Sequence, residues 1–482
     1  PLFPFSLPPS FKQTPMESNG GEASKIIDEI EALKAQKRQL EDRISTLESQ
    51  LRETSTAEQC PADSCNGACP SVSTVASAVS HHGLPSDAIY RYSRHLLLPS
   101  FGVQGQSNLL KSSILVVGAG GLGSPALLYL AACGVGRIGI VDHDIVELNN
   151  MHRQIIHTEA YIGKSKVESA AATCRSVNSA VEVVEYREAL RTSNALEIFS
   201  KYDLIIDATD NVPSRYMIND CCVVLGKPLV SGAALGLEGQ LTVYNYKGGP
   251  CYRCLFPTPP PMTACQRCAD SGVLGVVPGV IGTLQALEAI KIASGVGEPL
   301  TGRMLIFDAL SGRIRVVKIR GRSAQCDVCG EQAAFTSDGF REFDYEKFTQ
   351  FSLSTAPPKL NLIPEESRIS CKEYKEKVAN GEAHILIDVR PAHHFDIISL
   401  PNSLNIPLSS LESRLPEVSA ALNEEETRKG ISGAHLYTVC RRGNDSQRAV
   451  QLLHKMGFTS AKDIVGGLTS WQKEVDPNFP AY

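Results

Sequence analysis

The most restrictive feature of the chain is a glycine-rich turn between two apolar runs. Residues 114–117 form a β-branched run of strand length, and Gly118-Ala-Gly-Gly-Leu-Gly123 follows directly. A second strand-like run, residues 137–141, ends in Asp142, about twenty residues beyond the glycines. This order predicts a strand–turn–helix–strand unit whose glycines and helix N-terminus approach a phosphate, with the acidic residue near a ribose. The alternative is a tight turn that binds no ligand.

The spacing of apolar runs extends this unit into a larger sheet. We expect Ser124 to be the N-cap of the helix after the glycines, with Pro125 at its first position. Helical patterns separate strand-like runs at residues 114–118, 137–141, 181–185 and 203–208. Such alternation predicts an α/β fold with a mainly parallel, doubly wound, Rossmann-like sheet. Later runs at residues 240–246 and 303–319 are typical of antiparallel additions.

Composition limits the class of protein. The 482 residues suggest two or three domains, and a net charge of -5 argues against direct, general binding of nucleic acid. We expect no membrane span, because no apolar run approaches the necessary length. Fifteen cysteines are an odd number, and two Cys-x-x-Cys pairs look like metal ligands. We therefore expect a reducing, cytoplasmic compartment.

The chain divides into six expected segments. Residues 1–20 are expected to be disordered, 21–54 to form an amphipathic heptad helix, and 55–85, with Cys60, Cys65 and Cys69, to be a linker. The first large domain spans 86–345, a second linker 346–367, and a smaller α/β domain 368–482. The heptad seam consists of Ile26, Ile30, Leu33, Lys37, Leu40, Ile44, Leu47 and Leu51. It suits either a helix packed on its own domain or a short coiled coil with another chain.

Polar residues follow several strands of the first domain. They are Asn149, Asn150, Met151, His152, Arg153, Lys166, Asp210 and Asn211. Ligands of such sheets bind beyond the carboxyl ends of the strands, so the fold should bring these loops together. Arg153 and Lys166 would supply positive charge to phosphates, and Asp210 could hold Mg²⁺. This set favours a nucleotidyl transferase over a dehydrogenase, because charge builds up on phosphorus oxygens during transfer.

Cysteines suggest further chemistry in both domains. The pairs Cys251/Cys254 and Cys326/Cys329 suit one tetrahedral zinc ion, with a redox dithiol as the alternative. Cys265 and Cys268 lie in a loop after a proline-rich run, which could carry a nucleophile. Cys440 ends a strand-like run and precedes Arg441, Arg442 and a helix. Backbone N–H groups, the helix N-terminus and these arginines would stabilise a thiolate or persulfide; the alternative is a buried cysteine without chemistry.

Residues 86–345 resemble the MoeB/ThiF family, relatives of ubiquitin-activating enzymes. The stretches that carry the resemblance are Arg91–Arg94, Gly118–Gly123, Val141–Asp144, Asn150–Gln154, Gly163–Lys166, Asp207–Asn211 and Cys251–Cys254. The family uses ATP and Mg²⁺ to adenylate the C-terminal glycine of a ubiquitin-like protein. The resemblance therefore implies an ATP site that includes Gly121, Asp142, Asn149, Asn150, Met151, His152, Arg153, Lys166, Asp210 and Asn211.

Within this resemblance, Asp142 is the implied ribose ligand, Arg153 and Lys166 are the phosphate ligands, and Asp210 is linked to Mg²⁺. Arg94 matches an arginine that reaches the ATP site of a neighbouring subunit, which implies a homodimer. The resemblance also implies structural zinc at Cys251, Cys254, Cys326 and Cys329. The covalent cysteine of the family precedes Ala-Asp-x-Gly-Val-Leu-Gly, which makes Cys268 the expected counterpart and leaves Cys265 as an extra thiol.

The last domain resembles rhodanese along nearly its whole length. The matching stretches are Asp388–Arg390, Leu400–Pro407, the Cys440 loop and Gly466–Trp471. The resemblance implies a persulfide on Cys440. One departure is that Ala392-His-His-Phe395 stands where the family usually has an acidic residue after Asp-Val-Arg.

The fusion of both domains resembles the eukaryotic molybdenum cofactor synthesis protein 3 family of adenylyltransferases and sulfurtransferases. This resemblance implies carrier thiocarboxylates for molybdenum cofactor synthesis and tRNA wobble-uridine thiolation, with a cysteine desulfurase as sulfur donor. Two alternatives are a ubiquitin-like activating enzyme that serves only conjugation, and a non-catalytic scaffold.

Overall fold

The computed structural model describes residues 83–261, 272–353, 360–480 and 482, with isolated positions between 31 and 47. Those isolated positions are helical and exposed. Most of the expected heptad seam lies outside the described residues, as do the expected disordered segment 1–20 and residues 55–82. Cys60, Cys65, Cys69, Cys265 and Cys268 also lie outside them.

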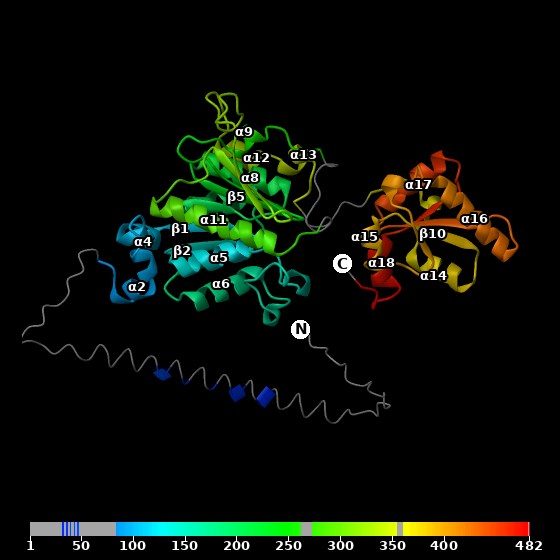
Figure 1. Cartoon of the computed structure of the whole chain (residues 1–482), viewed down its shortest axis with the longest axis horizontal. Coiled ribbons are helices and arrows are strands. Elements are labelled where there is room, and N and C mark those ends of the chain that lie inside the picture. The colour runs from blue at the N-terminus through cyan, green and yellow to red at the C-terminus, as the bar shows by residue number, and fades with distance from the viewer. Residues whose placement is uncertain are drawn as a thin grey trace, which may run out of the picture. The chain divides into compact units, whose positions relative to one another are not determined.

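The first α/β unit runs from α2 to α13 (Figure 1). Its helices are α2 Ser86–Arg91, α3 Ser93–Leu96, α4 Gly102–Lys111, α5 Gly123–Cys133, α6 Lys166–Val177, α7 Thr192–Ser200, α8 Val212–Val224, α9 Tyr252–Leu255, α11 Val276–Ser294, α12 Ser337–Glu342 and α13 Tyr345–Thr349. Its strands are β1 Ser113–Val117, β2 Arg137–Val141, β3 Glu182–Tyr186, β4 Leu204–Asp207, β5 Leu229–Leu235, β6 Glu238–Tyr244, β7 Arg303–Asp308 and β8 Arg313–Lys318.

Within the described residues these strands form one eight-stranded sheet in the order β3-β2-β1-β4-β5-β6-β7-β8. Strands β1 to β5 pair in parallel, and β6, β7 and β8 are antiparallel additions. The expected doubly wound sheet is confirmed, including the antiparallel runs. The order reverses between β1 and β4, and the carboxyl ends at such a reversal form the usual ligand crevice.

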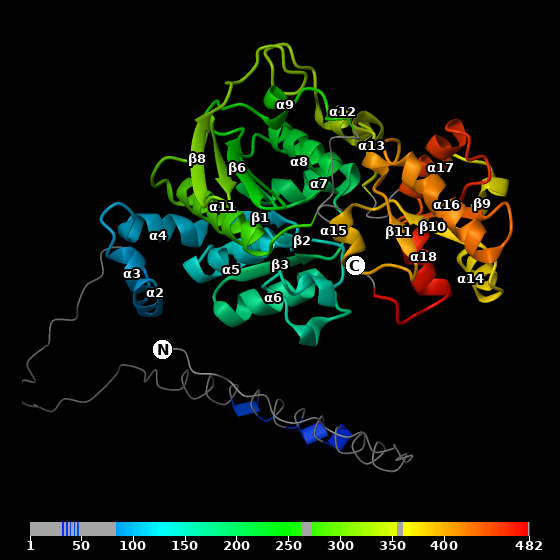
Figure 2. The same ribbon diagram turned by 45° about the vertical axis from the view of Figure 1, so that its right-hand side comes forward.

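The sheet is covered on both faces, as the two views show (Figures 1 and 2). Ile114 and Val116 of β1 pack into one core with α5, α6 and α11, whereas Leu115 and Val117 pack into another with α7 and α8. Successive residues of a strand point to opposite faces, so a continuous apolar run is what a doubly covered strand requires. This explains the uninterrupted run before the glycines.

The statement that no apolar run approaches the length of a membrane span is corrected by helix α11. Among the described helices it alone is long and apolar enough to cross a bilayer by length and composition, with a mean hydropathy of 1.4. Its residues Ile281, Ala286 and Ala289 are buried in the core beside α5 and β5. One face of this apolar helix therefore packs into the core of the first unit, while Val276 and Leu287 remain exposed.

The start of α5 also differs from the expectation. The helix begins at Gly123, so Ser124 already lies inside it and is not the N-cap. The hydroxyl of Ser124 donates to the carbonyl of Gly120 at 2.7 Å. A serine in the first turn of a helix satisfies its hydroxyl in this way when it is buried, and Ser124 is fully buried.

The second unit has its own parallel sheet in the order β11-β10-β12-β13-β9, counted over the described residues. Its strands are β9 Arg368–Ile369, β10 His384–Asp388, β11 Ser403–Asn405, β12 His435–Val439 and β13 Lys462–Ile464. Its helices are α14 Cys371–Ala379, α15 Ala392–Phe395, α16 Leu415–Lys429, α17 Asp445–Lys455 and α18 Gly467–Glu474. The smaller α/β domain that the sequence predicted is thereby confirmed.

Packing on both faces holds the second sheet. Leu386 and Tyr437 face a core with α14 and α18, and Ile387 and Leu436 face a core with α16 and α17. The residues just before β9 also join this unit, because the N–H of Leu360 donates to Asn444 Oδ1 at 3.1 Å.

Candidate functional site

The glycine turn after β1 is shaped by contacts that exclude side chains. Gly118 has φ +100°, and a Cβ there would lie 2.7 Å from the carbonyl oxygen of Ala208. A Cβ on Gly123 would lie 1.9 Å from the oxygen of Gly118. At Gly120, by contrast, the nearest atom would be Gln154 Nε2 at 3.8 Å. Gly118 and Gly123 thus close the turn, whereas Gly120 leaves room over the backbone for a ligand.

Asp142, at the end of β2, ties this turn to the neighbouring strand. Its Oδ2 accepts from the N–H of Ala119 at 2.8 Å, and its Oδ1 accepts from the N–H of Asp144 at 2.9 Å. Each carboxylate oxygen keeps acceptor capacity beyond these bonds. Asp142 can therefore position the glycine turn and accept a hydroxyl at the same time.

Two buried side chains under the turn were not singled out in the sequence. His157 Nε2 lies 3.0 Å from the carbonyl of Ala119, and its Nδ1 lies 3.0 Å from Ser169 Oγ. Burial lowers the pKa of His157, which favours the neutral ring. Gln154 is 4% exposed, and its Oε1 is buried with no hydrogen-bond partner. An unsatisfied amide oxygen beside the open glycine is what a site for a polar ligand would contain.

Basic and amide groups lie next to the turn. Lys166, the first residue of α6, is buried, and its Nζ lies 2.9 Å from Asp144 Oδ2. Arg153 Nη1 donates to the carbonyl of Asn149 at 2.8 Å. The 3-10 helix Leu148–Asn150 fixes Asn150, whose Oδ1 accepts from the N–H of Glu147 at 3.1 Å. Met151 and His152 complete this loop, with His152 exposed. Asp144, which holds Lys166, was not among the expected site residues.

The residues that follow β4 lie on the other side of the glycine turn from the end of β2. The N–H of Ala208 donates to the carbonyl of Val117, so the strand enters its loop directly beside the glycine turn. Asp207 is buried and accepts from Thr209 Oγ1 at 2.6 Å. Asp210 is exposed, and Asn211 is the N-cap of α8. The carboxylate of Asp210 is therefore accessible to a cation.

Not every predicted residue takes part in this arrangement. Gly121 belongs to the turn, but a Cβ there would lie 3.2 Å from Pro278 of α11. Arg94 is exposed on α3. Cys268, the expected covalent residue, lies outside the described part of the chain.

The four expected metal ligands form one buried cluster. The Sγ of Cys251 lies 3.7 Å from that of Cys254 and 3.6 Å from that of Cys326, and Cys254 Sγ lies 3.3 Å from Cys329 Sγ. A tetrahedral ion with Zn–S bonds of about 2.3 Å needs sulfurs roughly 3.8 Å apart, so the cluster fits a metal. The hydrogen bond from the Cys251 thiol lowers the pKa of the Cys254 thiol.

Arg253, between two of these cysteines, anchors the cluster to α8. Its guanidinium forms a buried ion pair with Asp220 at 2.7 Å, and the hydroxyl of Tyr345 donates to the same carboxylate at 2.8 Å. The ring of Phe348 lies 4.5 Å from Arg253 Cζ. The cysteine loop is thus held by a buried, hydrogen-bonded ion pair that aromatic rings surround.

In the second unit, Cys440 lies where β12 ends and α17 is about to begin. Its Sγ accepts from the N–H of Gly443 at 3.1 Å and lies 3.4 Å from Ser446 Oγ. Cys440 is 3% exposed. A Cβ on Gly467 would lie 2.1 Å from the Cys440 carbonyl oxygen, so α18 closes against this loop. The N–H of Gly443 is thus a backbone donor at this sulfur, of the kind that the sequence analysis expected there.

Arg390 and Arg441 donate to different groups. Arg390 is buried and its Nε lies 2.8 Å from Asp388 Oδ1, which makes the Asp-Val-Arg sequence a structural pair at the end of β10. Arg441 Nη2 donates to the main-chain oxygen of Tyr482. No sequence motif indicates this last contact, since the two residues are 41 positions apart.

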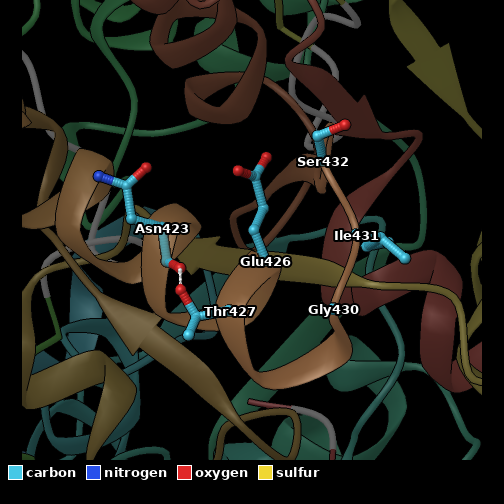
Figure 3. A pocket seen from close by; sticks show the side chains of 6 residues that line it. All are labelled: Asn423, Glu426, Thr427, Gly430, Ile431 and Ser432. Carbon is cyan, nitrogen blue, oxygen red and sulfur yellow. Dashed lines mark hydrogen bonds between the residues drawn. The ribbon is translucent and has the colours of Figure 1, made fainter.

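A surface hollow of about 450 Å³ in the second unit lies apart from these residues. It is formed by the last turns of α16 and the segment that follows (Figure 3). Glu426 points along it but already accepts from the N–H groups of Gly433 and Ala434 at 2.7 and 3.0 Å. None of the predicted site residues lines it, so it is not part of the candidate site.

Comparisons with known proteins agree with both units. The ThiF family matches residues 92–328, and the rhodanese-like domain matches residues 370–474. The first unit is therefore an adenylating module of the ATP-using ThiF type, and the second is a rhodanese-like sulfurtransferase module.

Relatives with both modules define the family. The chain is 66% identical to the adenylyltransferase and sulfurtransferase MOCS3 of Arabidopsis thaliana over 97% of this chain and 100% of the relative. It is 46% identical to the mouse (Mus musculus) protein of the same name over 94% of this chain and 99% of that one. The chain belongs to the MOCS3 family and has adenylyltransferase and sulfurtransferase activity. Among solved structures, E. coli MccB is 24% identical, with a TM-score of 0.45 over 50% of this chain and 73% of MccB.

Proposed function

We propose that this enzyme adenylates the C-terminal glycine of ubiquitin-like sulfur carriers and converts it into a thiocarboxylate. The proposed carriers are the small subunit of molybdopterin synthase and the ubiquitin-related modifier of tRNA thiolation. The enzyme would thereby serve molybdenum cofactor synthesis and wobble-uridine 2-thiolation. The observation that carries the proposal is that one chain holds both a glycine turn with basic residues beside it and a cysteine, Cys440, whose sulfur accepts an N–H bond from Gly443.

For the first step, we assign ATP to the crevice beyond β1, β2 and β4. Asp142 accepts from the ribose, and Gly120, Gly121 and the N-terminus of α5 lie along the phosphates. Arg153 and Lys166 would stabilise charge on the phosphates during attack by the carrier carboxylate, with Mg²⁺ at Asp210. The remaining loop residues, Asn149, Asn150, Met151, His152 and Asn211, would shape the nucleotide pocket. Arg94 would complete the site of a second subunit in a homodimer.

For the second step, the persulfide of Cys440 attacks the carbonyl carbon of the acyl-adenylate, and AMP leaves. This leaves an acyl disulfide on Cys440. The thiolate of Cys268 then attacks the Cys440 sulfur, the S–S bond breaks, and the thiocarboxylate leaves with the bonding electron pair. A cellular thiol reductant would reduce the resulting disulfide between Cys268 and Cys440 before the next cycle. A cysteine desulfurase would load Cys440 with sulfane sulfur. The N–H of Gly443 and the hydroxyl of Ser446 support this role, because both can donate to a terminal sulfur anion.

The cysteine cluster is proposed to hold one structural Zn²⁺. Four thiolates leave no open coordination position, so the ion would stabilise the fold and take no part in transfer. We assign the enzyme to the cytoplasm, where thiols and zinc-bound thiolates remain reduced.

The deciding experiment is mass spectrometry of a purified carrier incubated with the enzyme, ATP and a sulfur source. Replacement of one oxygen by sulfur at the C-terminus is the expected product. An enzyme that acts only in conjugation would instead give an adenylate and a thioester and leave the released carrier unchanged, which would reject the proposal. Omission of ATP is the matched control, because both outcomes require adenylation.

A further inference from the structure

Tyr482 connects two arginines of the second unit. Its main-chain oxygen accepts from Arg441 Nη2, and its ring centre lies 4.7 Å from Arg441 Cζ. Its hydroxyl accepts from Arg390 Nη1, and the same ring lies 5.7 Å from Arg390 Cζ. Tyr482 thus makes a polar and a cation–π contact with each of the two arginines and forms a bridge between them.

One end of this bridge is rigid. Arg390 is 3% exposed, and Asp388 opposite it is fully buried. The remaining donors of Arg390 reach the carbonyls of His394 and Ile398 at 3.0 and 2.7 Å. A buried guanidinium with this many partners has a single position. Tyr482 is therefore anchored to the end of β10.

The other end of the bridge is the loop that contains the reactive sulfur. Arg441 directly follows Cys440, and its carbonyl oxygen accepts from both the N–H and the Oγ1 of Thr469 at 2.9 Å. The main chain of Arg441 is thus fixed by α18. Its long side chain has several rotatable bonds, and the contacts with Tyr482 hold its guanidinium in one place.

We propose that Tyr482 is a positioning residue that holds the guanidinium of Arg441 beside the Cys440 loop for recognition of anionic sulfur donors. This proposal rests on the proposed role of Cys440. With thiosulfate, the Cys440 thiolate attacks the sulfane sulfur, the S–S bond of thiosulfate breaks, and sulfite leaves with the bonding electron pair. The donor and the leaving group are both dianions, so a fixed positive charge on the residue that follows Cys440 favours their binding.

The test is thiosulfate–cyanide sulfurtransfer by the full-length enzyme. Tyr482→Ala should raise the KM for thiosulfate by about three- to tenfold, the equivalent of one lost cation contact, with kcat changed less than twofold. Tyr482→Phe should change KM less, because it keeps the aromatic ring on Arg441 and loses only the hydroxyl contact with Arg390. Tyr482→Leu keeps the apolar bulk without the aromatic face and should match alanine, which separates recognition from packing.

A double-mutant cycle decides whether Tyr482 acts through Arg441. Arg441→Ala should raise the KM by a similar factor, and adding Tyr482→Ala to it should give no further increase. Full multiplication of the two effects, or an unchanged KM in Tyr482→Ala, would overturn the proposal. A fall in kcat alone would also overturn it. Cys440→Ala tests the proposed function separately: retained sulfurtransfer in that variant would reject the role of Cys440 and not the coupling of Tyr482 to Arg441.

Discussion

Lys166 Nζ lies 2.9 Å from Asp144 Oδ2, and the side chain of this lysine is only 8% exposed. A buried ammonium with one carboxylate partner keeps donors for a second anion. The ion pair therefore places a fixed positive charge at the N-terminus of α6, close to the end of β2.

We expect Lys166→Ala to reduce ATP–pyrophosphate exchange by roughly 100-fold or more, because one charge-stabilising donor typically contributes this much to transfer. Sulfurtransfer by the second unit should be unchanged. Lys164→Ala is the matched control, since Lys164 is an exposed lysine of the same segment that stacks on Tyr161. Loss of exchange in both variants would indicate general damage to the loop instead of a specific role for Lys166.

Cys326→Ser should abolish binding of one zinc ion per chain and lower the unfolding temperature of the first unit. The reason is that a four-thiolate site contributes folding free energy and has no catalytic position. Metal analysis and calorimetry measure both effects. Cys133→Ser, a partly buried cysteine outside the cluster, should retain the metal. A stable, active wild-type enzyme without metal would contradict the zinc assignment.

Asp220→Ala should destabilise the first unit by about 3–5 kcal/mol, because it leaves the buried guanidinium of Arg253 without a counter-charge. The side chains of Asp220 and Arg253 are 0% and 4% exposed. Glu197→Ala, which removes an exposed pair with Lys201, should cost less than about 1 kcal/mol. Denaturant unfolding of both variants gives the comparison. Equal losses of unfolding free energy in the two variants would mean that burial of the Asp220–Arg253 pair does not increase its contribution to stability.

Stability of the first unit should fall as the pH drops below the ordinary histidine range. Burial lowers the pKa of His157 from about 6.5, so below this pH the unfolded chain binds a proton at His157 and the folded chain does not. The contribution of His157 to stability is present above the ordinary histidine pKa and is lost as the pH falls toward the lowered pKa of the folded state. His157→Gln should flatten the pH dependence of the thermal midpoint between about pH 7 and 5. An unchanged slope would assign the effect to other groups.

Much of this arrangement was predictable because local chemistry requires it. Gly118 and Gly123 are turn glycines with no room for a Cβ, and Asp142 must end its strand for the sheet to work as a nucleotide crevice. The cysteine pairs likewise specify a ligand set through residue type alone. Such features are recognisable without tertiary information.

Other features depend on packing that no short stretch encodes. Ser124 has the residue type of an N-cap, but the helix begins two residues earlier than expected, at Gly123, with Leu122 as its N-cap. The side-chain oxygen of Gln154 lacks a hydrogen-bond partner because it is buried, and burial of this polar residue cannot be predicted from the sequence around it. Tyr482 reaches Arg390 across 92 positions, so its contact follows from the path of the whole second unit.

Cys440→Ala should stop thiocarboxylate formation without slowing pyrophosphate exchange. The proposed adenylation residues Asp142 and Lys166 lie in the first unit, so activation of the carrier should not need the Cys440 sulfur. That sulfur, in contrast, accepts the N–H of Gly443 at 3.1 Å, and a sulfane sulfur on it would be the nucleophile.

The measurement pairs isotope exchange for the first step with carrier mass for the second. Cys371→Ala is the matched control, because Cys371 is a buried cysteine of the same unit whose thiol donates to the carbonyl of Val465. It should retain both activities, whereas Cys268→Ala should keep exchange and impair the later transfer. Normal thiocarboxylate from Cys440→Ala with a persulfide-loaded desulfurase would show that sulfur reaches the adenylate by another route, and the proposed order of transfer would then be wrong at its central step.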